Sequence, residues 1–126
     1  MKTVARLTVL IADDDEEFLY TVKGIVEAEG LTAHLAGCGL DALEIVRKIP
    51  LHLSILDIQM PDISGLETYR RMRRIITPIP CIFVTGEFNE EIRQEAISTG
   101  AFSILEKPVD VQVLRTTVHE AITKAQ

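Results

Sequence analysis

Five short apolar runs recur along the chain, and each has a length that suits one β-strand. They lie at Leu7–Ala12, Thr32–Ala36, Leu53–Leu56, Cys81–Val84 and Ser103–Leu105. Runs of this kind, rich in aliphatic residues and ended by polar residues or turns, predict strands. Because the runs are nearly continuous rather than alternating, we expect strands that are covered on both faces of a parallel sheet.

The stretches between these runs carry apolar residues three to four positions apart, which predicts amphipathic helices. In the first stretch, Phe18, Val22 and Val26 form the apolar stripe. We expect Asp15 to cap the start of this helix and Asp110 to cap the start of the last one. The later helices are marked by Leu43, Val46 and Ile49, by Leu66, Tyr69, Met72 and Ile76, by Ile92, Ala96 and Ile97, and by Val111, Leu114, Val118 and Ile122.

Strands that alternate with helices predict an α/β fold with a parallel sheet and right-handed crossovers, which together give a doubly wound domain with helices on both faces. The 126 residues are enough for one such domain, and we expect residues 1–126 to form it. In a doubly wound sheet the functional site lies beyond the carboxyl ends of the strands. The polar residues that follow the strands are therefore the first candidates for function.

Composition narrows the classes of partner. The formal net charge of −6 gives no general attraction to nucleic acid or to an anionic membrane. Four arginines within Arg70–Arg74 form a local cluster of positive charge in this acidic chain. They are either a patch that binds a partner or, as we expect, a solvated face of a helix. No apolar stretch approaches the roughly 20 residues that span a bilayer, so we expect a cytoplasmic protein. Cys38 and Cys81 lack metal-ligand spacing and are expected to be small buried residues.

Carboxylates follow two of the predicted strands. Asp13 and Asp14 follow the first strand, and Asp57 follows the third. If these strands are neighbours, the three carboxylates crowd at one edge, where two like charges about 4 Å apart repel by about 4 kcal/mol at an effective dielectric near 20. Such a cluster must take up protons or hold a cation, and oxygen ligands suit Mg²⁺.

The remaining polar residues at this edge suit phosphoryl transfer. A carboxylate such as that of Asp57 can act as a nucleophile and form an acyl phosphate. Phosphoryl transfer needs in-line geometry and neutralised charge more than covalent assistance. A divalent ion, the hydroxyl of Thr85 after the fourth strand and the ammonium of Lys107 after the fifth would supply both.

The segments VLIADDDEE, LDIQMPDISGLE, FVTGE and GAFSILEKP, in this order and spacing, resemble the receiver domain of two-component response regulators. The resemblance covers essentially the whole chain. It implies a five-stranded parallel sheet in the flavodoxin-like order 2-1-3-4-5. It also implies that Asp57 is the phosphoacceptor, which takes a phosphoryl group from the phosphohistidine of a sensor histidine kinase or phosphotransfer protein.

The same resemblance assigns the other site residues. Asp14 and Asp57 would ligate Mg²⁺ or Mn²⁺ directly, Asp13 through a water molecule, and Gln59 through its backbone carbonyl. Thr85 would bond a phosphoryl oxygen, and Lys107 would pair with it. No organic cofactor is implied, and the domain would catalyse only its own phosphorylation and dephosphorylation.

The resemblance also implies a switch. Movement of Thr85 and Lys107 would alter a surface formed by Asn89–Ser98, Ser103–Leu105 and Val111–Lys124. The position of the family's aromatic switch residue is occupied by Ile104, whose aliphatic side chain cannot report movement of Thr85 by a ring flip or a hydroxyl hydrogen bond. Gln59 and Glu87 occupy positions that tune the lifetime of the phosphoaspartate, and the peptide bond before Pro108 is expected to be cis. The expected partners also include an output domain or target protein outside this chain, and a second copy of the chain in a homodimer.

Three other functions compete with this interpretation. A haloacid-dehalogenase-like phosphatase would also use an Asp nucleophile and Mg²⁺, but Asp13–Glu17 lacks the Thr or Val that ends its motif. A flavin-binding protein of the same fold would need hydroxyls and amides, where this chain has carboxylates. A receiver-like module that binds partners without phosphorylation is the third alternative, and Ile104 is the residue that keeps it open.

Overall fold

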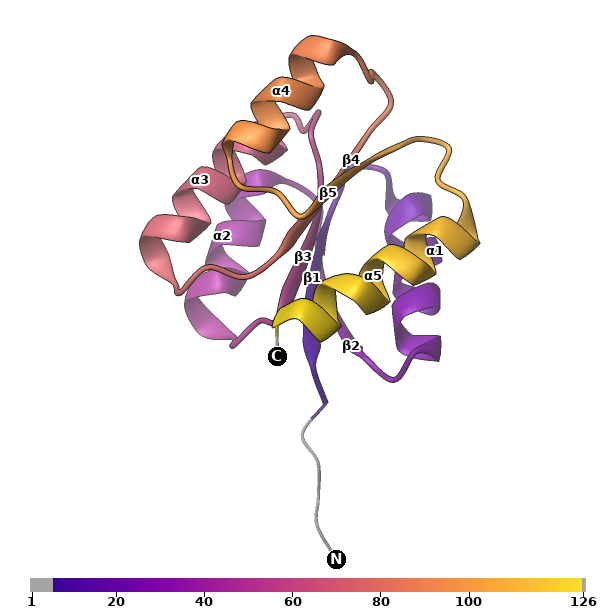
Figure 1. Cartoon of the computed structure of the whole chain (residues 1–126). Coiled ribbons are helices and arrows are strands. Elements are labelled where there is room, and N and C mark those ends of the chain that lie inside the picture. The colour runs from indigo at the N-terminus through magenta and orange to yellow at the C-terminus, as the bar shows by residue number, and fades with distance from the viewer. Residues whose placement is uncertain (1–5, 126) are drawn as a thin grey trace, which may run out of the picture.

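Five parallel strands form a single sheet in the structure, a computed structural model that describes residues 6–125 (Figure 1). The strands are β1 (Thr8–Ala12), β2 (Thr32–Ala36), β3 (Leu53–Asp57), β4 (Cys81–Thr85) and β5 (Ser103–Glu106). Their order across the sheet is β2-β1-β3-β4-β5, with every neighbouring pair parallel. The predicted strand order and direction are confirmed.

Five helices cover the two faces of the sheet. They are α1 (Glu16–Ala28), α2 (Gly39–Lys48), α3 (Gly65–Ile75), α4 (Glu90–Ser98) and α5 (Val111–Ala125). Helices α1 and α5 lie on one face, and α2, α3 and α4 lie on the other (Figure 1). This arrangement is the doubly wound architecture that the alternation of strands and helices predicts. None of these helices is long and apolar enough to cross a bilayer.

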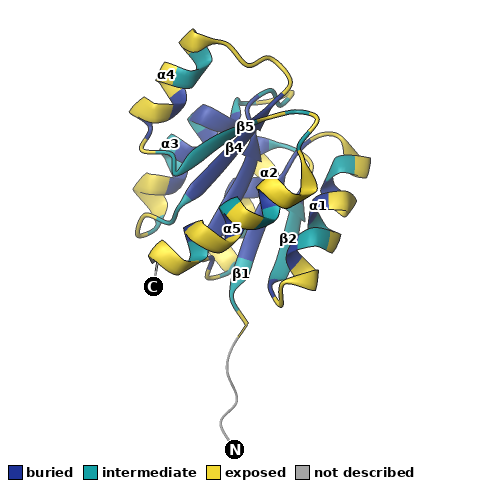
Figure 2. Ribbon diagram, turned by 45° about the vertical axis from the view of Figure 1, so that its right-hand side comes forward, coloured by how far each residue is buried: buried dark blue, intermediate teal, exposed yellow. Residues whose placement is uncertain are grey.

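The sheet separates two apolar cores. One contains Leu10, Leu56 and Phe83 from the strands together with residues of α2, α3 and α4, and the other contains strand residues packed against α1 and α5. Every residue of β3 and β4 is buried, which Figure 2 shows as a dark centre between exposed helix surfaces. Continuous apolar strands therefore occupy the middle of the sheet, as their sequences indicate.

The first helix confirms one prediction and refines another. Asp15 caps α1, since its carboxylate accepts hydrogen bonds from the backbone N–H groups of Glu17 and Phe18. The buried residues of α1 are Leu19, Val22 and Val26, so Leu19 rather than Phe18 completes the buried stripe. Phe18 is half-buried because it lies one position round the helix, beside the carboxyl edge of the sheet.

Two functional candidates belong to the strands themselves rather than to the loops after them. Asp57 is the last residue of β3 and pairs with Val84, and Thr85 is the last residue of β4 and pairs with Glu106. Ala12 of β1 pairs with Leu56 of β3, so the next residues along, Asp13 and Asp57, leave the sheet at the same level. The register of three neighbouring strands thus brings the candidates to one edge.

The structure also tests the predictions for the cap of the last helix, the two cysteines and the arginine run. Asp110 accepts a hydrogen bond from the backbone N–H of Val113 at 3.0 Å, as expected for a cap of α5. Cys81 is buried, but the prediction for Cys38 is wrong, since it is half-buried at the start of α2. In the arginine run, Arg71 pairs with Glu67 of its own helix, with a distance of 2.9 Å between Nε and Oε2.

Candidate functional site

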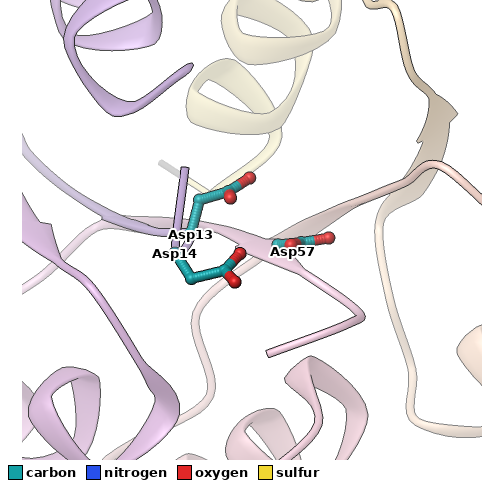
Figure 3. Close-up of side chains that lie close together, drawn as sticks. All are labelled: Asp13, Asp14 and Asp57. Atoms are coloured by element: carbon teal, nitrogen blue, oxygen red, sulfur yellow. The ribbon is translucent and has the colours of Figure 1, made fainter. Parts of the chain in front are cut away.

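Three carboxylates meet at the carboxyl edge of the sheet. Asp13, Asp14 and Asp57 each place a carboxylate oxygen within 4.8 Å of the others, and the three side chains extend to the same side in Figure 3. Asp13 is fully buried and Asp57 is only 4% exposed, whereas Asp14 is exposed. The crowding that the sequence predicts from neighbouring strand ends is therefore present.

Lys107 supplies the positive charge nearest to this cluster. Its Nζ lies 2.7 Å from Oδ2 of Asp13 and 3.6 Å from Oδ2 of Asp57, and it stands 4.5 Å from the ring centroid of Phe18. Partial burial lowers the pKa of Lys107, but the hydrogen bond to Asp13 and the charges of Asp57 and Asp13 outweigh it and raise the pKa overall. Lys107 is held in place by its own backbone N–H, which donates to the carbonyl of Thr85 at 2.8 Å, and the bond to Pro108 is cis.

The electrostatics of Asp57 follow from burial and crowding. Burial, followed by the charge of Asp13, raises the pKa of Asp57 from 3.8 to about 6. The charge of Lys107 and a hydrogen bond from the backbone N–H of Gln59 to Oδ1, at 3.3 Å, act in the opposite direction. Asp57 is thus a buried carboxylate that is still mostly ionised at neutral pH.

The donor set of this cluster suits a hard divalent cation. Three carboxylates and one ammonium leave an excess of negative charge, and Mg²⁺ binds through one or two carboxylates together with waters and phosphate oxygens. Both oxygens of Asp13 already have partners, since Oδ1 accepts the backbone N–H of Asp15 at 2.8 Å and Oδ2 binds Lys107. The exposed carboxylate of Asp14 and that of Asp57 are better placed for direct ligation.

Thr85, Gln59 and Glu87 form a hydrogen-bonded group beside Asp57. The Thr85 side chain is fully buried, and its hydroxyl donates to Oε1 of Gln59 at 2.8 Å. The same hydroxyl oxygen accepts the backbone N–H of Glu87 at 3.0 Å, while the Glu87 residue is exposed. The resemblance implies a backbone ligand and a lifetime-tuning side chain at Gln59, and the structure adds the bond between this side chain and Thr85.

The loop between β3 and α3 is fixed by two further residues. A Cβ atom at Gly65 would lie 2.2 Å from the backbone oxygen of Asp57, so this close approach requires glycine. Asp62 accepts hydrogen bonds from the backbone N–H groups of Gly39 and Leu40, at 3.0 and 2.8 Å, and so caps α2 from another segment. Although desolvation opposes them, these bonds hold the pKa of Asp62 well below its ordinary value.

The predicted switch residue, Ile104, lies on β5, the neighbour of the strand that ends at Thr85. Ile104 is a half-buried residue of β5 that is paired with Phe83 and packs against the apolar core containing Phe83 and Ala96. It therefore contacts the core on the side of the sheet that α4 covers (Figure 1). An aliphatic side chain here has no hydroxyl group with which to report the position of Thr85.

Comparison with known proteins identifies the family. A family model described as the response regulator receiver domain matches residues 9–119. The chain belongs to this family. A receiver is generally a phosphoacceptor that binds Mg²⁺ and interacts with histidine kinases or phosphotransfer proteins, rather than an enzyme that turns over external substrates. Membership favours the receiver over the phosphatase and flavin-binding alternatives.

The receiver is similar to proteins from diverse organisms. A CheY-like receiver domain protein from Methanospirillum hungatei JF-1 superimposes with a TM-score of 0.91 and 26% identity, over 96% of this chain and 97% of that one. A transcriptional regulatory protein ZraR from Klebsiella oxytoca is 31% identical over 93% of this chain but 26% of its own length. A probable cyclic di-GMP phosphodiesterase from Vibrio cholerae is 34% identical over 94% of this chain and 27% of its own length. The chain thus spans about a quarter of these two longer relatives, whose names differ in activity.

Proposed function

We propose that this receiver accepts a phosphoryl group on Asp57 from the phosphohistidine of a sensor histidine kinase or phosphotransfer protein, in a reaction that requires Mg²⁺ or Mn²⁺. The observation that carries the proposal is the position of the Asp57 side chain, which is only 4% exposed. One of its carboxylate oxygens lies within 4.8 Å of oxygens of Asp13 and Asp14, and its Oδ2 lies 3.6 Å from Nζ of Lys107. A buried carboxylate with a neighbouring cation and an excess of acidic ligands suits a nucleophile better than a structural residue.

In the proposed step, one Asp57 oxygen forms a bond to phosphorus while the bond between phosphorus and the histidine nitrogen breaks. The electron pair of the broken bond stays on the imidazole, which leaves as the neutral base if its other nitrogen already carries a proton and otherwise takes one proton from solvent. Asp14, Asp57 and the backbone carbonyl of Gln59 would hold the metal, with Asp13 acting through a water molecule. The bound ion would neutralise charge on the transferring oxygens.

Lys107 and Thr85 would stabilise the phosphorylated state. The new group adds about −1.5 to −2 charges and three acceptor oxygens at neutral pH. The Lys107 ammonium, already 2.7 Å from Asp13, would pair with one of these oxygens, and the Thr85 hydroxyl would donate to another. Because Thr85 ends β4 and Lys107 follows β5, their movement would reach the surface of α4, β5 and α5.

The output of the switch depends on Ile104 and on partners outside this chain. With an aliphatic residue at position 104, coupling to the surface of α4, β5 and α5 would rest on packing alone. We propose that residues 1–126 act as one receiver domain whose target is an output domain, a separate protein or a second copy of the chain. With a formal net charge of −6, the domain itself would not bind nucleic acid.

The phosphoaspartate would be lost by hydrolysis within the same site. The Gln59 side chain and the backbone N–H of the exposed Glu87 both bond the Thr85 hydroxyl, which would contact the phosphoryl group. We propose that these two side chains tune the lifetime of the phosphoryl group. The chemistry would be confined to phosphorylation and dephosphorylation of Asp57, without turnover of an external substrate.

Intact-mass spectrometry tests the proposed function. The protein is incubated with acetyl phosphate, with and without Mg²⁺, beside the Asp57→Asn variant. We expect the wild-type protein to gain one phosphoryl group only with Mg²⁺ and the variant to gain none. Failure of the wild-type protein to gain mass under any condition would overturn the proposal and would favour a receiver that binds its partners without phosphorylation.

A further inference from the structure

The hydroxyl group of Thr85 is fully engaged before any phosphoryl group is present. Its oxygen accepts the backbone N–H of Glu87 at 3.0 Å, and its proton is donated to Oε1 of Gln59 at 2.8 Å. The side chain is 0% exposed, so water does not compete for these bonds. A hydroxyl carries one proton, and here that proton is directed at Gln59.

Gln59 contacts both Asp57, which would accept the phosphoryl group, and Thr85, which would donate a hydrogen bond to it. Its backbone N–H donates to Oδ1 of Asp57 at 3.3 Å, and its side-chain oxygen accepts from Thr85. Gln59 is half-buried and lies two residues after the end of β3, so its backbone is held close to Asp57. The backbone of Gln59 is therefore held beside the phosphoacceptor, while its side chain is bonded to Thr85.

We propose that Gln59 is a positioning residue that holds the Thr85 hydroxyl in its resting orientation until a phosphoryl oxygen competes for the proton. This inference rests on the proposed function, in which Thr85 donates to the phosphoryl group. A single proton cannot serve both acceptors fully, so the bond to Gln59 must be given up when Asp57 is phosphorylated. A neutral hydrogen bond of this kind shifts an equilibrium by roughly 2- to 10-fold.

A double-mutant cycle on the full chain tests the inference. Gln59→Met keeps the length of the side chain but removes the acceptor, Thr85→Val removes the hydroxyl, and Thr85→Ser keeps it. The initial rate of phosphorylation by acetyl phosphate at saturating Mg²⁺ is measured for each variant. We expect Gln59→Met to raise the rate roughly 2- to 10-fold in the wild-type and Thr85→Ser backgrounds and to leave it unchanged in the Thr85→Val background.

The alternatives give different patterns in the same cycle. If Gln59 acts only by obstructing the phosphodonor, Gln59→Met raises the rate equally in all three backgrounds, which would overturn the inference. No change in any background would overturn it as well. Both results are distinct from a failure of the proposed function, in which the wild-type protein itself takes up no phosphoryl group.

A second measurement needs no phosphorylation. The χ1 rotamer of Thr85 can be obtained by NMR from three-bond couplings of its methyl carbon in the unmodified protein. We expect a single rotamer in the wild-type protein and rotamer averaging in Gln59→Met. A single unchanged rotamer in Gln59→Met would show that the backbone N–H of Glu87 alone holds the hydroxyl, and the inference would fail.

Discussion

Replacing Asp57 with asparagine should stabilise the metal-free protein at neutral pH. The substitution removes one negative charge from a site where Asp13 and Asp14 lie within 4.8 Å, and it keeps an oxygen that can accept the backbone N–H of Gln59. Lys107 retains its closer partner, Asp13, at 2.7 Å. The variant therefore relieves repulsion and desolvation without leaving a buried cation unpaired.

The magnitude follows from the pKa of Asp57. Burial and the charge of Asp13 raise this pKa from 3.8 to about 6, which at 1.36 kcal/mol per pKa unit corresponds to about 3 kcal/mol. Because the folded protein binds the proton more tightly than the unfolded chain, ionisation of Asp57 opposes folding as the pH rises. The cost is absent below pH 3.8, grows between pH 4 and 6, and is complete above that range.

Urea denaturation in EDTA measures the effect. At pH 7.5 we expect Asp57→Asn to raise the free energy of unfolding by up to about 3 kcal/mol, a midpoint shift of about 1–3 M, and at pH 4 we expect little difference. Asp14→Asn, which removes a charge from an exposed side chain of the same cluster, is the matched control and should stabilise less. A difference that does not change with pH, or a less stable Asp57→Asn protein at pH 7.5, would refute the electrostatic reasoning.

Other substitutions test separate parts of the site, each by urea denaturation. Lys107→Met should lower the free energy of unfolding in EDTA by about 3 kcal/mol, because it leaves the buried Asp13 without its cation. Added Mg²⁺ should restore part of this stability. Gly65→Ala should lower the free energy of unfolding by about 1–3 kcal/mol, because the new Cβ would meet the Asp57 backbone oxygen. The same substitution should also slow phosphorylation. A protein with unchanged stability would contradict the close approach. Asp62→Ala should cost about 1 kcal/mol at pH 7 by uncapping α2. This difference should shrink as the pH falls below 3.8 towards the lower folded pKa of Asp62, and a difference independent of pH would exclude the carboxylate as its source.

The convergence of the site could be predicted because it depends on strand ends. In a parallel sheet all carboxyl ends lie on one edge, so the positions of Asp13, Asp57 and Lys107 after apolar runs were enough to bring them together. The helices could be predicted because apolar residues recur three to four positions apart in each stretch between the strands. The predicted apolar stripe of Phe18, Val22 and Val26 packs against the core, but the pattern did not show that Leu19 is buried more deeply than Phe18, because both are apolar and spacing alone fixes the facing of a helix only to within one position.

The side-chain contacts within the site could not be predicted in the same way. Asp62 caps a helix that begins 23 residues earlier, and no local pattern in the sequence indicates such a partner. The bond between Thr85 and Gln59 depends on side-chain orientation, which residue spacing does not determine. The family resemblance indicated that positions 59 and 85 matter, but not that their side chains bind each other.

Chemical trapping of the phosphoryl group tests the central claim most directly. Borohydride reduces an aspartyl phosphate to homoserine, so the modified residue is retained through digestion and located by peptide mass spectrometry. After incubation with acetyl phosphate and Mg²⁺, we predict homoserine at position 57 and at no other aspartate, with none formed in EDTA. Homoserine at position 13 or 14, or none in a protein that retains the fold, would contradict the assignment of Asp57 as the phosphoacceptor.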